Sequence, residues 1–326
     1  MRNPVIPASG EFVFQDTWGK DYYGTSRDIG PGHGDGTSGS EIGAFNAPKT
    51  LRIEQGYLFV LDSGNHRIQK FYLLGAPKPF SDQTAEGVTL NCLGSEGYKT
   101  NQFVDPSDLC VSFIAGDIFV ADRENFCVQV FDMTGKAIKT LARILNGRPA
   151  ATNAPGGFFR PTAVAVNPFR ELFVLDTGKS TVDKFLNSLN IDASWGTGGS
   201  LYNPAFASAV DIEGNDNNFW IYVLCRTKIL KFGDSGNLVE EMDLAGFGPD
   251  RLANASRLAI SADMLIITDG NYVKFFDFDG HFLYSIGGLS GDRDGEFNSP
   301  DGAYLFDDRL YVADTGNNRI QLFERR

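Results

Sequence analysis

The sequence predicts an all-β protein, a six-bladed β-propeller of four-stranded antiparallel blades. One observation is a repeat: residues 310–323 nearly copy residues 58–71, each an apolar strand, a polar Gly-Asn turn and a second strand. A second is that weaker copies of the same unit lie between them. Short strands recurring at this spacing favour a ring of blades over a sandwich.

Composition supports one continuous array of such units. The chain has 326 residues, of which 42% are hydrophobic and 21% charged, so it can bury a core. Its 27 Phe and 37 Gly suit short strands joined by tight turns. The four cysteines are too few for a disulfide scaffold, and we expect them to be small buried side chains.

The units are expected in a fixed internal order. Each opens with an aromatic residue, in most units followed by a proline, and continues into strands with turn residues between them. The second strand of each unit is nearly continuous in apolar residues, as expected for a strand covered on both faces. The expected openings are Phe45, Phe103, Phe159, Tyr202, Phe247 and Phe297. The expected blades are residues 45–94, 103–141, 159–196, 202–242, 247–287 and 297–326.

The two ends of the chain complement each other. The last unit contains only three strands, and residues 10–19 resemble the fourth strand of the preceding unit, at 280–287. We therefore predict that residues 12–18 pair with residues 320–323 and complete blade 6. The propeller then spans residues 10–326, after a short arm at 1–9. Closure of the ring removes exposed strand edges.

The motif resembles a known repeat. Phe-x-x-Pro followed by Val-Ala-Asp-Thr-Gly-Asn-Asn-Arg-Ile-Gln-x-Phe is similar to the NHL repeat, whose members form six-bladed propellers. The resemblance covers essentially the whole chain and is closest in blades 1 and 6. Blade 4 departs from it, because Cys225 stands at the position of the turn aspartate. Blade 5 keeps Asp269 but has a shorter turn.

Charged residues at the turns of blades 1 and 6 recur five positions apart. We interpret Asp62 with Arg67, and Asp314 with Arg319, as structural pairs in which the carboxylate caps the turn. The alternative is a ring of charged ligand contacts. Cys127 in blade 2 replaces the arginine, which breaks the symmetry of any such ring.

One face of the propeller is the expected binding surface. The turns between second and third strands share a face with the linkers between blades, and the longest linkers are 20–44, 142–158 and 287–296. The candidate binding residues on this face and at the channel mouth are Lys49, His66, Asp108, Phe126, Arg257, Tyr272 and Asp301. The opposite face carries an insertion at 73–89.

Metal-dependent catalysis is the alternative that the resemblance raises. Related propellers include a lyase with a zinc ion held by histidines and calcium-dependent lactonases. This chain has three histidines, with His33 and His66 expected on one face and His281 on the other, so they cannot converge on one zinc ion. Asp108 and Asp301 could contribute to a calcium site. We predict no cofactor and leave calcium open.

Other ligand classes find little support. The net charge of −12 repels nucleic acids and anionic lipids, and the nearest approach to a basic cluster is Arg143, Arg148 and Arg160. The glycine-rich stretch 30–36 lacks the lysine and helix of a phosphate-binding loop. The acidic stretches 211–218 and 292–296 are expected to be turns.

We therefore predict a non-enzymatic NHL-type propeller that acts as a rigid protein-binding or assembly module. One version is a subunit of a larger particle or appendage, with residues 1–9 and 73–89 as docking elements. The alternative is a metal-dependent lyase or lactonase-type hydrolase with its site at the channel mouth. With no membrane-length apolar run and no signal-peptide pattern, we expect a soluble protein, in the cytoplasm or in a particle.

Overall fold

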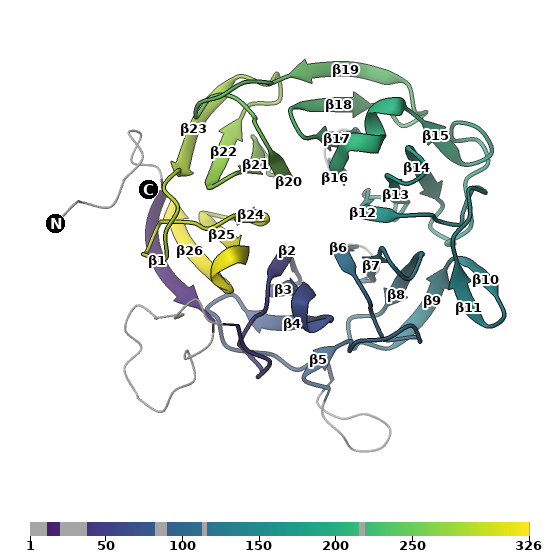
Figure 1. Ribbon diagram of the computed structural model, residues 1–326, viewed down its shortest axis with the longest axis horizontal. Helices are drawn as coiled ribbons and strands as arrows, with labels where there is room; N and C mark the ends of the chain where they lie inside the picture. The colour runs from purple at the N-terminus through teal and green to yellow at the C-terminus, as the bar shows by residue number, and fades with distance from the viewer. Residues whose placement is uncertain (1–11, 20–37, 82–89, 113–115, 215–218, 326) are drawn as a thin grey trace.

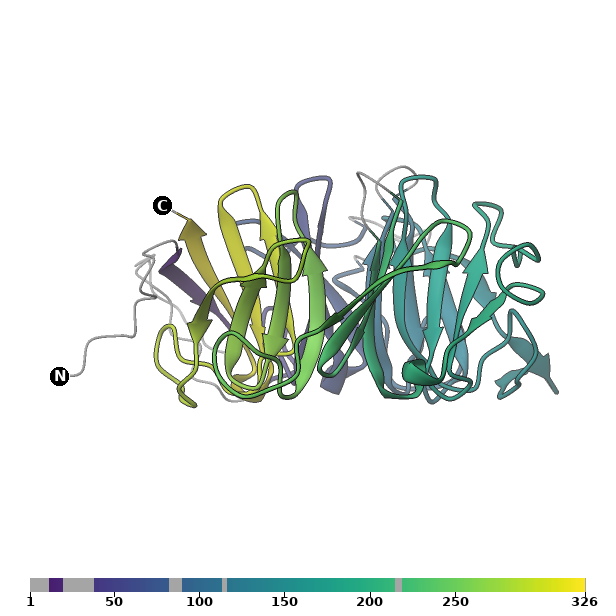
Figure 2. The same ribbon diagram turned by 90° about the horizontal axis from the view of Figure 1, so that it is seen from above.

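The structure is a ring of six four-stranded antiparallel sheets around a central axis (Figure 1). It is a computed structural model that describes residues 12–19, 38–81, 90–112, 116–214 and 219–325. Seen edge-on, the ring is a disc about one strand length thick (Figure 2). This confirms the predicted fold class. The predicted arm, His33 and residues 82–89 of the predicted insertion lie outside the described residues.

Each blade runs from an inner strand near the axis to an outer strand at the rim (Figure 1). Blade 1 contains β2 (Pro48–Glu54), β3 (Tyr57–Asp62), β4 (Arg67–Tyr72) and β5 (Cys92–Leu93). Blade 2 contains β6 (Pro106–Val111), β7 (Ile118–Asp122), β8 (Cys127–Phe131) and β9 (Ala137–Leu141). Blade 3 contains β12 (Pro161–Val166), β13 (Leu172–Asp176), β14 (Thr181–Phe185) and β15 (Ser200–Tyr202).

The second half of the ring follows the same order. Blade 4 contains β16 (Ala209–Gly214), β17 (Ile221–Cys225), β18 (Lys228–Phe232) and β19 (Leu238–Asp243). Blade 5 contains β20 (Ala255–Ile260), β21 (Leu265–Asp269), β22 (Tyr272–Phe276) and β23 (Phe282–Gly287). Blade 6 contains β24 (Gly302–Phe306), β25 (Arg309–Asp314), β26 (Arg319–Arg325) and β1 (Phe12–Trp18).

The N-terminal strand closes the ring as predicted. β1 pairs antiparallel with β26, with Trp18 opposite Ile320 and Phe14 opposite Phe323. A bulge between Phe14 and Asp16 bends the strand at the rim. Phe12 and Trp18 are almost fully buried, so the closure also contributes apolar packing between blades.

The core lies between neighbouring sheets. All residues of β7, β13, β17 and β21 are buried, which confirms that second strands are covered on both faces. One large apolar side chain at each blade opening is fully buried and packs into these clusters. These side chains are Phe45, Phe103, Phe158, Phe206, Leu252 and Phe297.

Three of the predicted openings are therefore wrong. In blade 3 the buried residue is Phe158, and its neighbour Phe159 is 48% exposed. Tyr202 ends the outer strand of blade 3, and blade 4 opens instead in a short 3-10 helix (Pro204–Ser208). In blade 5 Leu252 takes the core position, while Phe247 is 94% exposed between two glycines with positive φ.

The linker between blades 2 and 3 holds an element that the sequence did not predict. β10 (Arg143–Leu145) and β11 (Arg148–Ala150) form a separate two-stranded hairpin outside the blades. Ile144 and Leu145 on this hairpin are exposed.

The cysteines are free thiols, as expected. Cys110, Cys127 and Cys225 are buried and Cys92 is partly buried. No helix in the described part of the chain is long and apolar enough to cross a membrane.

Deleting residues 1–19 should leave the outer edge of β26 unpaired and remove Phe12 and Trp18 from the core. Loss of one buried tryptophan alone costs about 3–5 kcal/mol, so we expect an unfolded or aggregated product in size-exclusion chromatography and thermal melts. Deleting only residues 1–9 retains β1 and is the control, with an expected melt close to that of the full chain. A truncation at residue 19 that folds normally contradicts the closure argument.

Candidate functional site

A buried aspartate at the end of the second strand fixes one face of the blade in five of the six blades. In blade 1 Asp62 accepts a hydrogen bond from the backbone N–H of Asn46, just after the buried Phe45, at 2.7 Å. It also accepts one from Arg67 Nε, at 2.7 Å. Asp314 and Arg319 repeat this arrangement in blade 6. Each carboxylate thus joins a turn to the linker that enters the same blade.

Blades 2, 3 and 5 use the same device with two linker N–H groups. Asp122, Asp176 and Asp269 each accept hydrogen bonds from two consecutive backbone amides. In blade 4 Cys225 cannot do this, and its thiol lies 3.5 Å from the Ala205 carbonyl oxygen instead. The linkers and the turns between second and third strands therefore share one face, as predicted. We call it the linker face.

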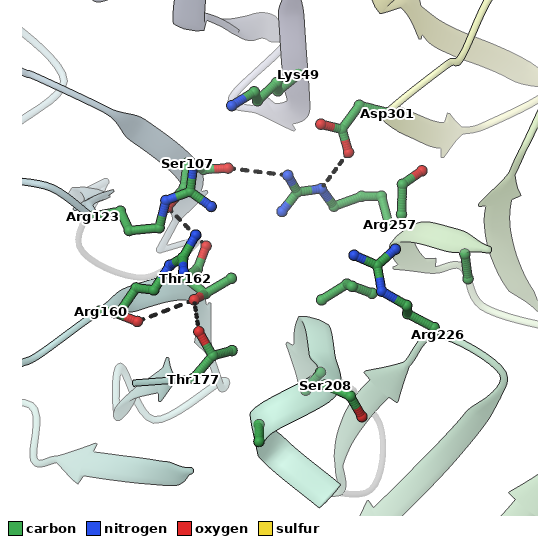
Figure 3. A pocket seen from close by; sticks show the side chains of 15 residues that line it. Lys49, Ser107, Arg123, Arg160, Thr162, Thr177, Ser208, Arg226, Arg257 and Asp301 are labelled. Atoms are coloured by element: carbon green, nitrogen blue, oxygen red, sulfur yellow. Dashed lines mark hydrogen bonds and ion pairs between the residues drawn. The ribbon is translucent and has the colours of Figure 1, made fainter. Parts of the chain in front are cut away.

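A polar pocket of about 340 Å³ lies at the channel mouth on the linker face (Figure 3). Side chains from several blades point into it, because the inner strands all begin around the axis. Its lining includes Lys49, Ser107, Arg123, Arg160, Thr162, Thr177, Ser208, Arg226, Ser256, Arg257 and Asp301.

The pocket is electropositive even though the chain is acidic overall. As far as the structure describes it, the lining contains five cationic side chains and one carboxylate. Arg123 pairs with Asp105, and Lys49 lies 3.9 Å from the same carboxylate. Among the described residues, no carboxylate lies within ion-pair distance of Arg160 or Arg226. These two arginines are exposed at the rim and available to a ligand.

Below the pocket, Arg257 closes the channel with ion pairs. Its guanidinium lies 3.1 Å from Asp108, 3.3 Å from Asp211 and 3.5 Å from Asp301, and donates to the Ser107 carbonyl oxygen at 3.0 Å. The arginine is only 5% exposed. The partners come from several blades, so this network ties inner strands together across the axis.

The two deepest carboxylates also accept backbone hydrogen bonds from the next blade. Asp108 accepts from Val164 N at 2.9 Å, and Asp211 accepts from Leu258 N at 2.8 Å. Burial raises the pKa of Asp211 to about 7, although Arg257 acts in the opposite direction. Charge in this network is therefore closely balanced.

The structure places the predicted site residues in two groups. Lys49, Arg257 and Asp301 line the pocket, whereas Asp108 lies beneath it and is fully buried. Of the others, His66 and Phe126 occupy turns between second and third strands and Tyr272 begins the third strand of blade 5; none of them lines the pocket.

Three pocket arginines were not among the predicted site residues. Arg123 and Arg226 each follow the last residue of a second strand, as Thr177 does in blade 3. Arg160 directly precedes an inner strand. The available signal was their shared position, since the residue that directly follows the second strand lines the pocket in blades 2, 3 and 4.

The channel carboxylates do not form an open cation site. Asp108, Asp211 and Asp301 converge on the Arg257 guanidinium, which already supplies the positive charge there. Within the described residues, one group has metal-ligand spacing: Asp277, Asp279 and His281. It lies in an outer turn on the face opposite the pocket, where the Asp277 carboxylate accepts hydrogen bonds from the backbone N–H groups of Asp279 and His281.

Comparison with known proteins agrees with the repeat pattern. A sequence model of the NHL repeat matches residues 103–131 and 297–323. This chain is a six-bladed propeller with NHL repeats. Residues of the B-box type zinc finger protein ncl-1 of Caenorhabditis elegans are 32% identical over 123 positions. That alignment covers 36% of this chain but only 14% of the length of ncl-1.

Solved propellers share the fold at low sequence identity. An auxiliary nutrient binding protein from Bacteroides ovatus has a TM-score of 0.66 at 12% identity, covering 97% of this NHL propeller and 77% of that chain. Virginiamycin B lyase from Staphylococcus aureus has a TM-score of 0.57 at 12% identity, covering 86% and 95%. A gluconolactonase from Xanthomonas campestris gives 0.57 at 12%, covering 86% and 87%. At these identities the likeness shows the fold alone.

Replacing Arg257 with alanine should destabilise the propeller, because it leaves Asp108 and Asp211 buried without a counter-charge. Breaking such a pair costs about 3–5 kcal/mol, measurable by urea unfolding at pH 8. The raised pKa of Asp211 means that its ionisation disfavours folding as pH rises, so the loss should be smaller at pH 5. Arg226→Ala at the exposed rim is the control, with little expected change. Equal losses in both variants contradict the network.

Proposed function

We propose that this NHL propeller is a non-enzymatic binding module whose channel mouth receives an acidic segment of a protein partner. The observation that carries the proposal is the charge of the pocket: five lining cations face one lining carboxylate. Arg160 and Arg226 at the rim retain no carboxylate partner of their own among the described residues. A carboxylate-bearing ligand would supply the missing charge.

The floor of the pocket is held rigidly, which favours ligand binding. Arg257 is buried and held by three carboxylates, so the site has a fixed base from which the rim arginines project. Rigid placement of cationic donors lowers the entropy cost of binding an anion. Propeller blades joined across the axis provide this rigidity.

The part of the lining that the structure describes offers no pair of groups for nucleophilic or acid–base catalysis. It contains hydroxyl groups but no histidine or cysteine. Ser107 donates to the Thr162 carbonyl oxygen at 2.8 Å, and the hydroxyls of Thr162 and Thr177 lie 2.7 Å apart. Ser107 thus joins blade 2 to blade 3, and the two threonines join strands within blade 3, so we assign these hydroxyls to the scaffold.

An acidic protein segment fits the molecule better than a nucleic acid does. The net charge of −12 repels a long polyanion, whereas the pocket of about 340 Å³ accommodates one or two acidic side chains. The exposed apolar residues Phe159 and Val104, which directly precede Arg160 and Asp105 in the sequence, suit contact with a protein surface.

Charge reversal at the rim tests the proposal. A fluorescent hexaglutamate peptide should bind saturably in fluorescence anisotropy, and the double variant Arg160→Glu, Arg226→Glu should weaken binding by about tenfold or more. Lys136→Glu, an exposed charge reversal in a turn on the opposite face, is the control and should leave binding unchanged. An unstructured RNA of equal charge serves as a competitor.

Three outcomes contradict the proposed function. They are an absence of saturable peptide binding, equal binding by the double variant, and RNA binding that is tighter than peptide binding with a steep salt dependence. The last of these would assign the linker face to nucleic acid.

Adding metal ions distinguishes the proposed binding module from the alternative, a metal-dependent enzyme. We expect the melting temperature to be the same with calcium, with zinc and after treatment with a chelator, because the channel carboxylates are engaged by Arg257. Asp301→Ala should likewise change stability little. A clear upward shift with one metal, lost in Asp301→Ala, favours the hydrolase or lyase alternative.

A further inference from the structure

A cation joins the linker to the turn in four of the six blades. In blade 1 the Arg67 guanidinium donates to the carbonyl oxygens of Ser40, Glu41 and Ala44, as well as to Asp62. Arg319 makes the equivalent four contacts in blade 6.

Lysines take this role in two further blades. In blade 3 Lys179 Nζ donates to the Gly157 carbonyl oxygen and to Asp183, both at 2.8 Å. In blade 5 Lys274 Nζ donates to the carbonyl oxygens of Gly248 and Arg251 and to Asp269. Blade 4 lacks the turn aspartate, and Lys228, which stands opposite Cys225, pairs instead with Glu241.

Blade 2 keeps the acceptors but lacks the cation. Its turn aspartate, Asp122, is fully buried, and Cys127 stands where blades 1 and 6 have arginine. Counting back from the buried phenylalanine, Tyr98 and Lys99 occupy the positions of Ser40 and Glu41. Their carbonyl oxygens therefore have no guanidinium to accept from within the blade.

The blade 2 loop nevertheless has the same backbone conformation as its counterparts. Gly97 N donates to the Phe103 carbonyl oxygen, as Gly39 N does to that of Phe45. Asn125 Nδ2 donates to the Gly97 carbonyl oxygen at 2.9 Å, a contact that blades 1 and 6 repeat. The loop thus holds the acceptor geometry without the donor.

A pocket of about 380 Å³ occupies this place, within the usual size range of small-ligand sites, about 300–1,000 Å³. One wall is the loop of blade 2 and another is the β10–β11 hairpin, the element unique to this linker. The lining includes Tyr98, Lys99, Thr100, Cys127, Gln129 and Arg148. The same loop leaves Asn101 Oδ1 buried without a hydrogen-bond partner.

We propose that the blade 2 pocket binds the guanidinium group of an arginine side chain presented by a protein partner. The guest would occupy the place that Arg67 and Arg319 fill in their own blades. It would donate to the Tyr98 and Lys99 carbonyl oxygens and point toward Asp122, which is fully buried next to the pocket and is not itself part of the lining. A planar group with several N–H donors matches this set of acceptors better than a compact ammonium does.

Arg148 of this chain lies at the entrance of the blade 2 pocket and does not occupy the position that Arg67 has in blade 1. Its guanidinium lies over the Tyr98 ring, 3.7 Å from the ring centroid, and its side chain is exposed. Tyr98 and the hairpin therefore frame the entrance, and a guest chain would pass between them.

The buried Asp122 carboxylate should make guest binding depend on pH. Burial raises the pKa of Asp122 to about 6. A guest cation favours the ionised form, so binding should weaken as pH falls through 6. A guest held only by hydrogen bonds to carbonyl oxygens would show no such dependence.

The test uses N-acetyl-arginine amide as the probe and N-acetyl-citrulline amide as its uncharged match. Titration followed by NMR should show saturable shifts of the Asn125 and Gln129 side-chain amides with the arginine probe, and binding of the citrulline probe about tenfold weaker or more. At pH 5 the arginine probe should bind more weakly than at pH 7.5. Free L-arginine distinguishes a side chain from a free amino acid.

Cys127→Arg restores the residue of blades 1 and 6 and is the decisive variant. It should raise the melting temperature by a few degrees and abolish probe binding, while hexaglutamate binding at the channel mouth stays unchanged. Cys127→Ser is the matched control and should bind the probe as the parent does.

Four results overturn the inference. The first is the absence of a saturable shift at about 10 mM probe, which excludes even a millimolar Kd, and the second is undiminished binding in Cys127→Arg. The third is binding that appears only in Arg148→Ala, which would show that Arg148 itself occupies the pocket. The fourth is tighter binding of free L-arginine than of the capped probe, which would assign the pocket to a free amino acid.

Discussion

The propeller depends on a buried carboxylate at the end of the second strand. In five blades this aspartate accepts backbone N–H groups from the linker that enters the same blade. A linker between blades would otherwise bury amides without acceptors, which is costly. The bond fixes where the chain turns toward the axis, and so which side chain enters the core and which faces the channel. Blade 4, where Cys225 replaces the aspartate, needs a 3-10 helix to make the same entry.

Much of this architecture was predictable because it repeats. Three local patterns predicted the blades and the ring closure. They are the apolar second strands, the aspartate–arginine spacing and the missing fourth strand. The openings of blades 3 and 5 were not predictable from composition. Phe158 and Phe159 are equally apolar, and only the hydrogen bond from Phe159 N to Asp176 decides which one is buried. In blade 5 the aromatic-proline motif at Phe247 imitates an opening that Leu252 provides.

The candidate site was predicted in part for the same reason. Lys49, Arg257 and Asp301 occupy strand openings that must surround the axis, so repeat register alone places them. Arg123 and Arg226 lie directly after second strands, and whether their side chains reach the pocket depends on how the blades pack around the axis. Asp108 was placed correctly near the axis, but its burial under Arg257 follows from ion pairs between blades that no linear pattern contains. The channel thus combines a neutralised interior that holds the blades together with a cationic rim that faces solvent.

The pairing of β1 with β26 has a consequence for how the molecule is made. Its two partners are far apart in the sequence, so a ribosome releases the first strand long before it synthesises the second. Until β26 has been made, Phe12 and Trp18 have no docking place, and the growing chain exposes an apolar segment. Such a non-local contact is reached late in folding. The ring therefore closes only once β26 has left the ribosome, and chaperones have the opportunity to shield β1 until then.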